Sequence, residues 1–185
     1  FNMDNNIQIA TFGGGCFWCI DAAFRRVKGV LNVSSGYAGG EIENPSYQQI
    51  CTGLTGHAEV VQLDFDSSIV SYNTLLEMFF TLHDATQLNR QGNDVGTQYR
   101  SVIYYHNEQQ KAESQAMIDA LQKQIREPIV TELSPLTNFY PAEQYHQDYY
   151  NENPNQGYCS ILIAPKLAKF EQYYADKLKW KKPAK

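Results

Sequence analysis

Three consecutive glycines, Gly13–Gly15, separate two segments with different hydrophobic periods. Before them, residues 7–12 alternate apolar and polar side chains, which predicts a short β-strand. After them, residues 17–27 repeat apolar side chains at the spacing of one helix face, which predicts a helix. The chain must therefore turn directly from a strand into a helix, with Cys16 at the start of that helix.

The rest of the chain continues this mixture of strand and helix patterns. Strands are expected at residues 30–37, 57–65, 100–105, 129–133 and 160–163, and helices at 47–51 (one turn), 71–83, after Asn107, 142–150 and 166–178. Two of the strands follow each other as in a hairpin, which favours a mixed sheet over a purely parallel one. We therefore expect an α+β two-layer sandwich with a mixed, mainly antiparallel sheet, and a single catalytic domain over residues 1–185.

Composition excludes several classes of function. The net charge of −5 argues against a nucleic-acid partner, and no apolar run approaches the roughly 20 residues of a membrane span. The four cysteines are too few for a disulfide scaffold in 185 residues. They form neither two C-x-x-C pairs nor a pair with suitably spaced histidines, so we expect no metal.

Cys16 lies where unpaired backbone N–H groups and the positive end of a helix dipole stabilise a thiolate. A nucleophilic role is therefore expected, and the alternative is an inert buried cysteine after a glycine turn. The next two side chains point about 100° apart around the helix. If Phe17 faces the core, Trp18 is free to form the wall of a pocket beside the sulfur.

Glu59 is the expected proton donor. In the strand at residues 57–65 it shares one face with Val61, Leu63 and Phe65. A carboxyl on the apolar face is desolvated, which raises its pKa and retains its proton near neutrality. The alternative is a glutamate at the end of a strand, reaching solvent.

Several segments together resemble the A-type peptide methionine-sulfoxide reductases: "GGGCFWC", "GYAGG", "PSYQQICTGLTGHAEVV", "HDATQLNRQGNDVGTQYRS" and "YHQDYYNENPNQGYC". This resemblance implies a two-layer α+β plait and reduction of methionine S-sulfoxide, free or in oxidised proteins. It implies the following site: Cys16 as nucleophile, Phe17 and Trp18 around the substrate methyl group, Glu59, Tyr47 and Tyr99 around the sulfoxide oxygen, Asp94 in support, and Cys159 as the resolving thiol. His146 is added as a substrate-binding candidate because it precedes Cys159 on a segment that suits the groove; the alternative is a helix-surface position.

The expected cycle begins with attack of Cys16 on the sulfoxide sulfur while Glu59 delivers a proton to its oxygen. Cys16 becomes a sulfenic acid, a second thiol closes a disulfide, and thioredoxin or a similar dithiol reduces it. Cys159 is the favoured second thiol because it follows a flexible Pro/Gly/Asn stretch, with Cys19 left open. Cys51 is expected to be an inert packing residue.

No metal or organic cofactor is implied, and the chain is expected to act as a monomer. A cytoplasmic location is expected, or a periplasmic or secreted one if a signal peptide has been removed.

Two other classes of function remain open. A thiol-disulfide oxidoreductase of the thioredoxin type would use Cys16 and Cys19 directly, because its C-x-x-C also opens a helix. The glycine triplet and the long polar loop fit that class less well, and Glu59 has no role in it. The third class is a noncatalytic peptide-binding module that uses Trp18 and the tyrosines as its surface.

Overall fold

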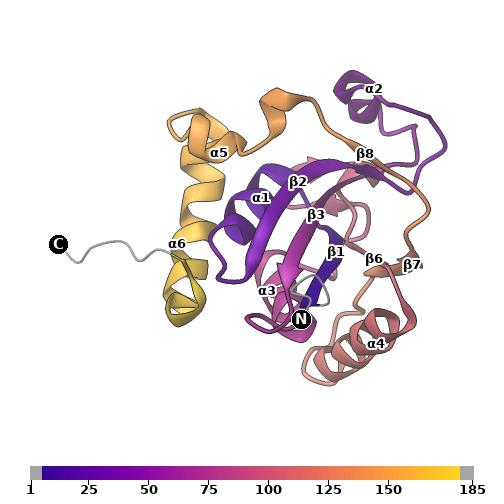
Figure 1. Cartoon of the computed structure of the whole chain (residues 1–185). Helices are drawn as coiled ribbons and strands as arrows, with labels where there is room; N and C mark the ends of the chain where they lie inside the picture. The colour runs from indigo at the N-terminus through magenta and orange to yellow at the C-terminus, as the bar shows by residue number, and fades with distance from the viewer. Residues whose placement is uncertain (1–5, 180–185) are drawn as a thin grey trace.

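A six-stranded sheet forms the centre of the computed structural model, which describes residues 6–179 (Figure 1). Its strand order is β7-β6-β1-β3-β2-β8. The strands are β1 (Ile7–Gly13), β2 (Val30–Ala38), β3 (Ala58–Asp66), β6 (Val102–Tyr105), β7 (Glu132–Pro135) and β8 (Phe139–Pro141). Every neighbouring pair is antiparallel except β6 and β7, so the predicted mixed, mainly antiparallel sheet is confirmed.

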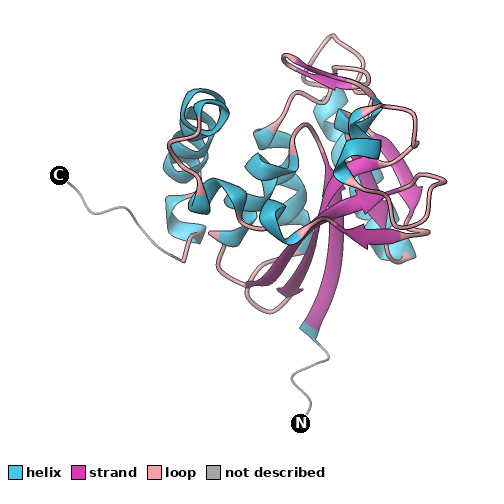
Figure 2. Ribbon diagram, turned by 90° about the horizontal axis from the view of Figure 1, so that it is seen from above, coloured by secondary structure: helices cyan, strands magenta, loops and turns pink. Residues whose placement is uncertain are grey.

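The helices are α1 (Phe17–Arg25), α2 (Tyr47–Cys51), α3 (Tyr72–Leu82), α4 (Glu108–Gln122), α5 (Tyr149–Glu152) and α6 (Ala164–Tyr173). Figure 1 shows α5 and α6 beside α1, on the opposite side of the molecule from α4, which packs near β6 and β7. Figure 2 shows most helices on one side of the strands. Aromatic rings fill the space between the layers; Phe12 of β1 and Phe79 of α3 stack with centroids 5.0 Å apart. This packing is the predicted α+β two-layer arrangement.

Three polar caps fix the starts of helices. The side chains of Ser46, Ser71 and Asn107 each accept a backbone N–H three residues further on, at the starts of α2, α3 and α4. Such caps satisfy N–H groups that have no partner within the helix.

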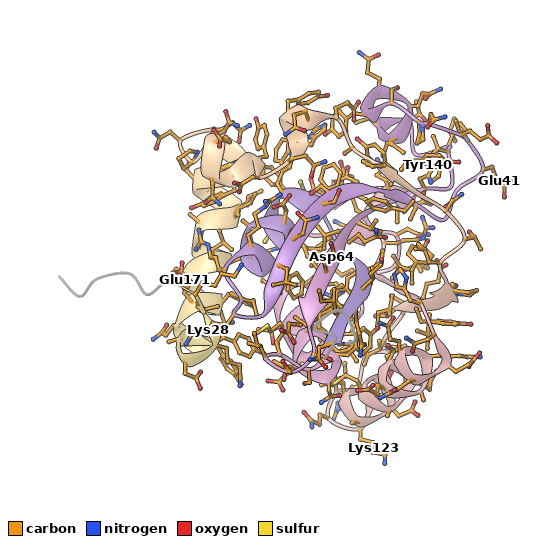
Figure 3. All side chains as sticks on the ribbon, viewed as in Figure 1. Lys28, Glu41, Asp64, Lys123, Tyr140 and Glu171 are labelled. Atoms are coloured by element: carbon orange, nitrogen blue, oxygen red, sulfur yellow. The ribbon has the colours of Figure 1, made fainter. Side chains whose placement is uncertain are left out.

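An ion pair between Arg26 and Glu171 joins the end of α1 to α6. Figure 3 labels Glu171 and Lys28 on this side of the molecule.

The register of the central strands brings the glycine turn next to Glu59. β1 runs antiparallel to β3, with Phe12 opposite Val61, and β2 places Tyr37 opposite Glu59. A Cβ atom at Gly13 would lie only 2.7 Å from the backbone oxygen of Glu59. The absence of a side chain at Gly13 therefore allows the end of β1 to reach Glu59.

The strand predicted at residues 160–163 is wrong. Residues Cys159–Ile163 form a π-helical segment that continues into α6. The buried side chains of this region are Ile163, Leu167, Phe170 and Tyr174, spaced three or four residues apart. This is the period of a helix, and a short apolar run read by itself does not reveal it.

Two further segments differ from the prediction. The helix expected at residues 142–150 is interrupted, because Asp148 has a left-handed backbone (φ 55°) between a 3₁₀ turn at Gln144–His146 and α5. The last helix, expected at residues 166–178, ends as an α-helix at Tyr173 and continues as a 3₁₀ turn, Ala175–Lys177.

The strand predicted at residues 129–133 begins later in the chain, where it forms β7 (Glu132–Pro135). Two features have no signal in the sequence: strand β8, and the small hairpin of β4 (Arg90–Gln91) and β5 (Asp94–Val95) in the long polar loop. That loop also holds a 3₁₀ turn, Thr97–Tyr99.

Among residues 6–179, no helix combines the length and apolar character that crossing a membrane requires. The single domain predicted for residues 1–185 includes two chain ends that lie outside the described residues, and it stays a prediction.

Candidate active site

Cys16 stands at the N-cap of α1, half-buried at the point where β1 gives way to the helix. Gly15 before it has φ +80°, a left-handed conformation that glycine adopts at no steric cost. The Gly15 N–H donates to the carbonyl oxygen of Tyr99, 3.1 Å away. This hydrogen bond fixes the thiol relative to the 3₁₀ turn that carries Tyr99.

The thiolate expected for resting Cys16 is not supported. Burial raises the pKa of the Cys16 thiol well above its usual value, and the nearby Glu59 carboxyl raises it further. A hydrogen bond from the Trp18 backbone acts in the opposite direction, as expected at a helix start, but it does not outweigh burial. A pKa raised in this way favours the protonated thiol of Cys16 over the thiolate.

Glu59 is buried, as its place on the apolar face of β3 predicts. Its side chain is almost inaccessible, at 1% exposed, and Oε1 accepts the backbone N–H of Phe17 at 3.2 Å. Burial raises the pKa of Glu59 to about 8, and that one hydrogen bond lowers it only in part. With a pKa of about 8, the carboxyl holds its proton at pH 7.

The buried Glu59 carboxyl makes the stability of the fold depend on pH. A group whose folded pKa is raised stabilises the fold fully below its unfolded pKa, here about 4.5, and loses this contribution as pH rises through about 8. We expect up to about 1.4 kcal/mol of unfolding free energy to be lost per pH unit in that window. Urea unfolding of the parent and of Glu59→Gln at pH 5 and pH 8 measures this loss. The parent should lose more stability than the variant, and equal losses would mean that Glu59 ionises normally.

Tyr47 and Tyr99 lie around this carboxyl. Burial raises the pKa of each phenol, and the nearness of Glu59 is the second cause for both. Their hydroxyl groups therefore stay protonated and can donate hydrogen bonds beside Glu59.

Two residues that the sequence did not reveal hold Tyr47 in place. Glu143 accepts the Tyr47 backbone N–H through Oε2 and the Tyr37 hydroxyl through Oε1, both at 2.8 Å. No local pattern in the sequence connects these positions, which the pairing of β8 with β2 brings together.

Phe17 and Trp18 separate as predicted: Phe17 is fully buried and Trp18 is half-buried. The Trp18 indole stacks on Tyr149 with centroids 3.8 Å apart and meets the Tyr158 ring edge-on. These rings form an aromatic wall that covers the start of α1.

His146 completes this wall. It is only 1% exposed, so it does not lie on a helix surface. The Trp18 Nε1–H donates to His146 Nδ1 at 3.0 Å. Burial lowers the pKa of His146, so the ring is neutral and its proton lies on Nε2. Within residues 6–179 this Nε2 has no hydrogen-bond partner, which leaves a buried donor available to a ligand.

Asp94 reaches the same region from β5 and accepts a hydrogen bond from the Tyr158 hydroxyl. Cys16, Asp94 and Tyr158 line one cavity of about 180 Å³. The structure thus gathers Cys16, Glu59, the two phenols, the aromatic wall and Asp94 around the start of α1.

Cys159 and Cys51, the two cysteines outside α1, lie in different surroundings. Cys159 is fully buried in the core at the start of the π-helical segment, shortly after the exposed residues 153–157, and its resolving role stays a prediction. Cys51 is exposed at the end of α2, which corrects the packing role expected for it. Among residues 6–179, no three histidine, cysteine or acidic side chains group as a metal site would require.

A cysteine at a helix start, beside a buried protonated carboxyl and phenols, is an arrangement suited to an enzyme with a thiol nucleophile and a proton donor. The model of a family described as peptide methionine sulfoxide reductase matches residues 8–178. A protein of Saccharolobus solfataricus named peptide methionine sulfoxide reductase MsrA is 54% identical over 173 residues, which is 94% of this chain and 98% of the relative. The chain belongs to the peptide methionine sulfoxide reductase family.

Solved structures share the fold. Mxr1 from Saccharomyces cerevisiae in reduced form is 33% identical, with a TM-score of 0.79, over 84% of this chain and 90% of that chain. Mxr1 has also been solved in complex with Trx2, and that chain aligns at 24% identity with a TM-score of 0.58, over 80% of this chain and 89% of its own.

Proposed function

We propose that this chain reduces methionine S-sulfoxide, free or in oxidised proteins, with Cys16 as the nucleophile and Glu59 as the acid. The observation that carries the proposal is the neutral, buried Glu59 carboxyl, held by the Phe17 N–H beside the half-buried thiol. A sulfoxide is a poor electrophile until its oxygen is protonated or firmly hydrogen-bonded. Glu59, Tyr47 and Tyr99 supply a proton and two phenolic donors at one place.

In the proposed reaction the Cys16 sulfur attacks the sulfoxide sulfur while Glu59 gives its proton to the oxygen. This attack forms a sulfur–sulfur bond in an adduct of Cys16 and the substrate. The adduct then rearranges: the oxygen moves to the Cys16 sulfur, the sulfur–oxygen bond of the substrate and the sulfur–sulfur bond both break, and methionine leaves. The proton released by the Cys16 thiol restores the Glu59 carboxyl, so the products are methionine and a Cys16 sulfenic acid. Phe17 and Trp18 hold the methyl group, and Asp94 and the free His146 Nε2–H bind polar groups of the substrate.

A second thiol then closes a disulfide, and a dithiol such as thioredoxin reduces it. The family resemblance assigns the second thiol to Cys159. The complex of Mxr1 with Trx2 supports a thioredoxin as the partner. A cycle that needs a steady supply of dithiol suits a reducing compartment such as the cytoplasm.

The C-x-x-C formed by Cys16 and Cys19 also fits a second function, direct thiol-disulfide exchange with protein disulfides. The experiment follows NADPH consumption with thioredoxin and its reductase, and offers either methionine sulfoxide or an oxidised protein disulfide. Our proposal expects rapid consumption with the sulfoxide and stereospecific use of its S epimer. Consumption with the protein disulfide alone would overturn it.

Replacing Trp18 with alanine should weaken substrate use. Loss of the indole removes apolar contact to the methyl group worth on the order of 1–3 kcal/mol, which is about 10–200-fold in kcat/KM. Steady-state kinetics with methionine sulfoxide measures the effect. The matched variant Trp18→Phe keeps a ring beside Tyr149 and should lose less. Unchanged kcat/KM together with a lower melting temperature in Trp18→Ala would make Trp18 a packing residue only.

A further inference from the structure

Cys16 and Cys19 open onto the same cavity. Its volume is about 180 Å³, and Gly14, Gly15, Asp94, Tyr158, Ile163 and Lys166 are among the other residues that line it. The cavity lies between the start of α1, the β4–β5 loop and the first turns of the C-terminal helical segment. A thiol that the proposed mechanism does not use therefore faces the space beside the nucleophile.

We propose that Cys19, rather than Cys159, resolves the Cys16 sulfenic acid, so that the first disulfide after turnover joins Cys16 to Cys19. This inference rests on the proposed function, because only oxygen transfer to Cys16 creates the sulfenic acid.

The backbone already holds the two cysteines within reach of each other. Cys19 lies one turn into α1, and its N–H donates to the Cys16 carbonyl oxygen at 3.3 Å. Residues three apart on a helix are neighbours, at a separation that a disulfide can bridge. Cys16 is the N-cap with an extended backbone, so its side chain can adjust without breaking the helix.

Burial raises the pKa of both candidate resolving thiols, to about 11 for Cys19, so acidity does not single out Cys19. The case for Cys19 is its position, because it lines the cavity that Cys16 also lines, with Lys166 on the same wall.

Cys159 is held away from the cavity. It is 0% exposed, its N–H donates to Gln156 Oε1 at 3.0 Å, and it is not among the residues that line the cavity. Cys19, in contrast, lines the cavity beside Cys16.

The step balances in atoms and electrons. The Cys19 sulfur attacks the Cys16 sulfur, a sulfur–sulfur bond forms, and the sulfur–oxygen bond of the sulfenic acid breaks. The hydroxide that leaves takes up the proton of the Cys19 thiol and departs as water. An external dithiol later reduces the disulfide and is itself oxidised.

Mass spectrometry distinguishes the two disulfides directly. The enzyme is given one equivalent of methionine sulfoxide without reductant, free thiols are alkylated, and the protein is digested with trypsin. Both Cys16 and Cys19 lie in the tryptic peptide 1–25, whereas Cys159 lies in the peptide 127–166. The inference expects peptide 1–25 to be lighter by two hydrogen atoms, unalkylated and not cross-linked. Peptide 1–25 cross-linked to peptide 127–166 would overturn it.

Variants test the same point kinetically. Cys19→Ser should still release a first equivalent of methionine, accumulate a sulfenic acid that dimedone traps, and turn over at least about tenfold more slowly with thioredoxin. Cys159→Ser should still form the disulfide within peptide 1–25, and Glu41→Gln, at an exposed position outside the site, serves as the control with parental turnover. Fast disulfide closure in Cys19→Ser, lost in Cys159→Ser, would reject Cys19. If Cys19→Ser does not fold, the peptide masses of the parent enzyme still decide. Absence of any released methionine from the parent would instead contradict the proposed function itself.

Discussion

Replacing Cys16 with serine is expected to abolish methionine sulfoxide reduction, by on the order of 10⁴-fold or more. The hydroxyl of serine is far less acidic than a thiol, so its anion is not accessible near neutral pH. Serine also cannot form a sulfenic acid. The measurement is methionine released in a single turnover, because this readout does not depend on the recycling thiol.

The control for Cys16→Ser is Glu41→Gln, since Glu41 is exposed and lies outside the site. This control should release methionine at the parental rate. Substantial residual turnover in purified, folded Cys16→Ser would contradict the assignment of the nucleophile.

Replacing Glu59 with glutamine is expected to slow the sulfoxide step by about 10²–10⁴-fold, the usual contribution of a general acid. The amide is nearly isosteric, and its oxygen can still accept the Phe17 N–H, so the fold should be kept. It can donate a hydrogen bond to the sulfoxide oxygen but cannot give up a proton. Single-turnover kinetics measures this loss.

Glu41→Gln is the control for the same chemical change on an exposed side chain, which Figure 3 labels at the edge of the molecule. It should retain parental rates. A Glu59→Gln rate within about threefold of the parent would place the proton source elsewhere.

The features that could be predicted from the sequence are those set by the spacing of apolar and polar side chains within one segment. Alternation along β3 was enough to place Glu59 on the apolar face, and its burial and raised pKa follow from that position. The glycine turn likewise indicated a strand followed by a helix, with Cys16 between them. The mainly antiparallel sheet followed from the order of the strand patterns.

The features that could not be predicted depend on contacts between distant segments. Nothing near His146 in the sequence shows that Trp18 will donate to it across 128 positions. The helix-start position of Cys16 suggested a thiolate, but the depth at which neighbouring segments bury it decides its pKa. The run after Cys159 is short and apolar, so its helical period becomes evident only when Leu167 and Phe170 are seen to pack beside Ile163.

The aromatic wall over α1 has a consequence for biosynthesis. Tyr149 and Tyr158, which cover Trp18 and reach Asp94, belong to the last fifth of the chain, whereas Cys16 and Glu59 belong to its first third. A polypeptide emerges from the ribosome N-terminus first. The thiol and the acid are therefore translated well before the segment that shields them. Until residues 149–158 have emerged, the Cys16 sulfur of a nascent chain lacks the aromatic wall. It is then exposed to the same oxidants whose damage the finished enzyme reverses.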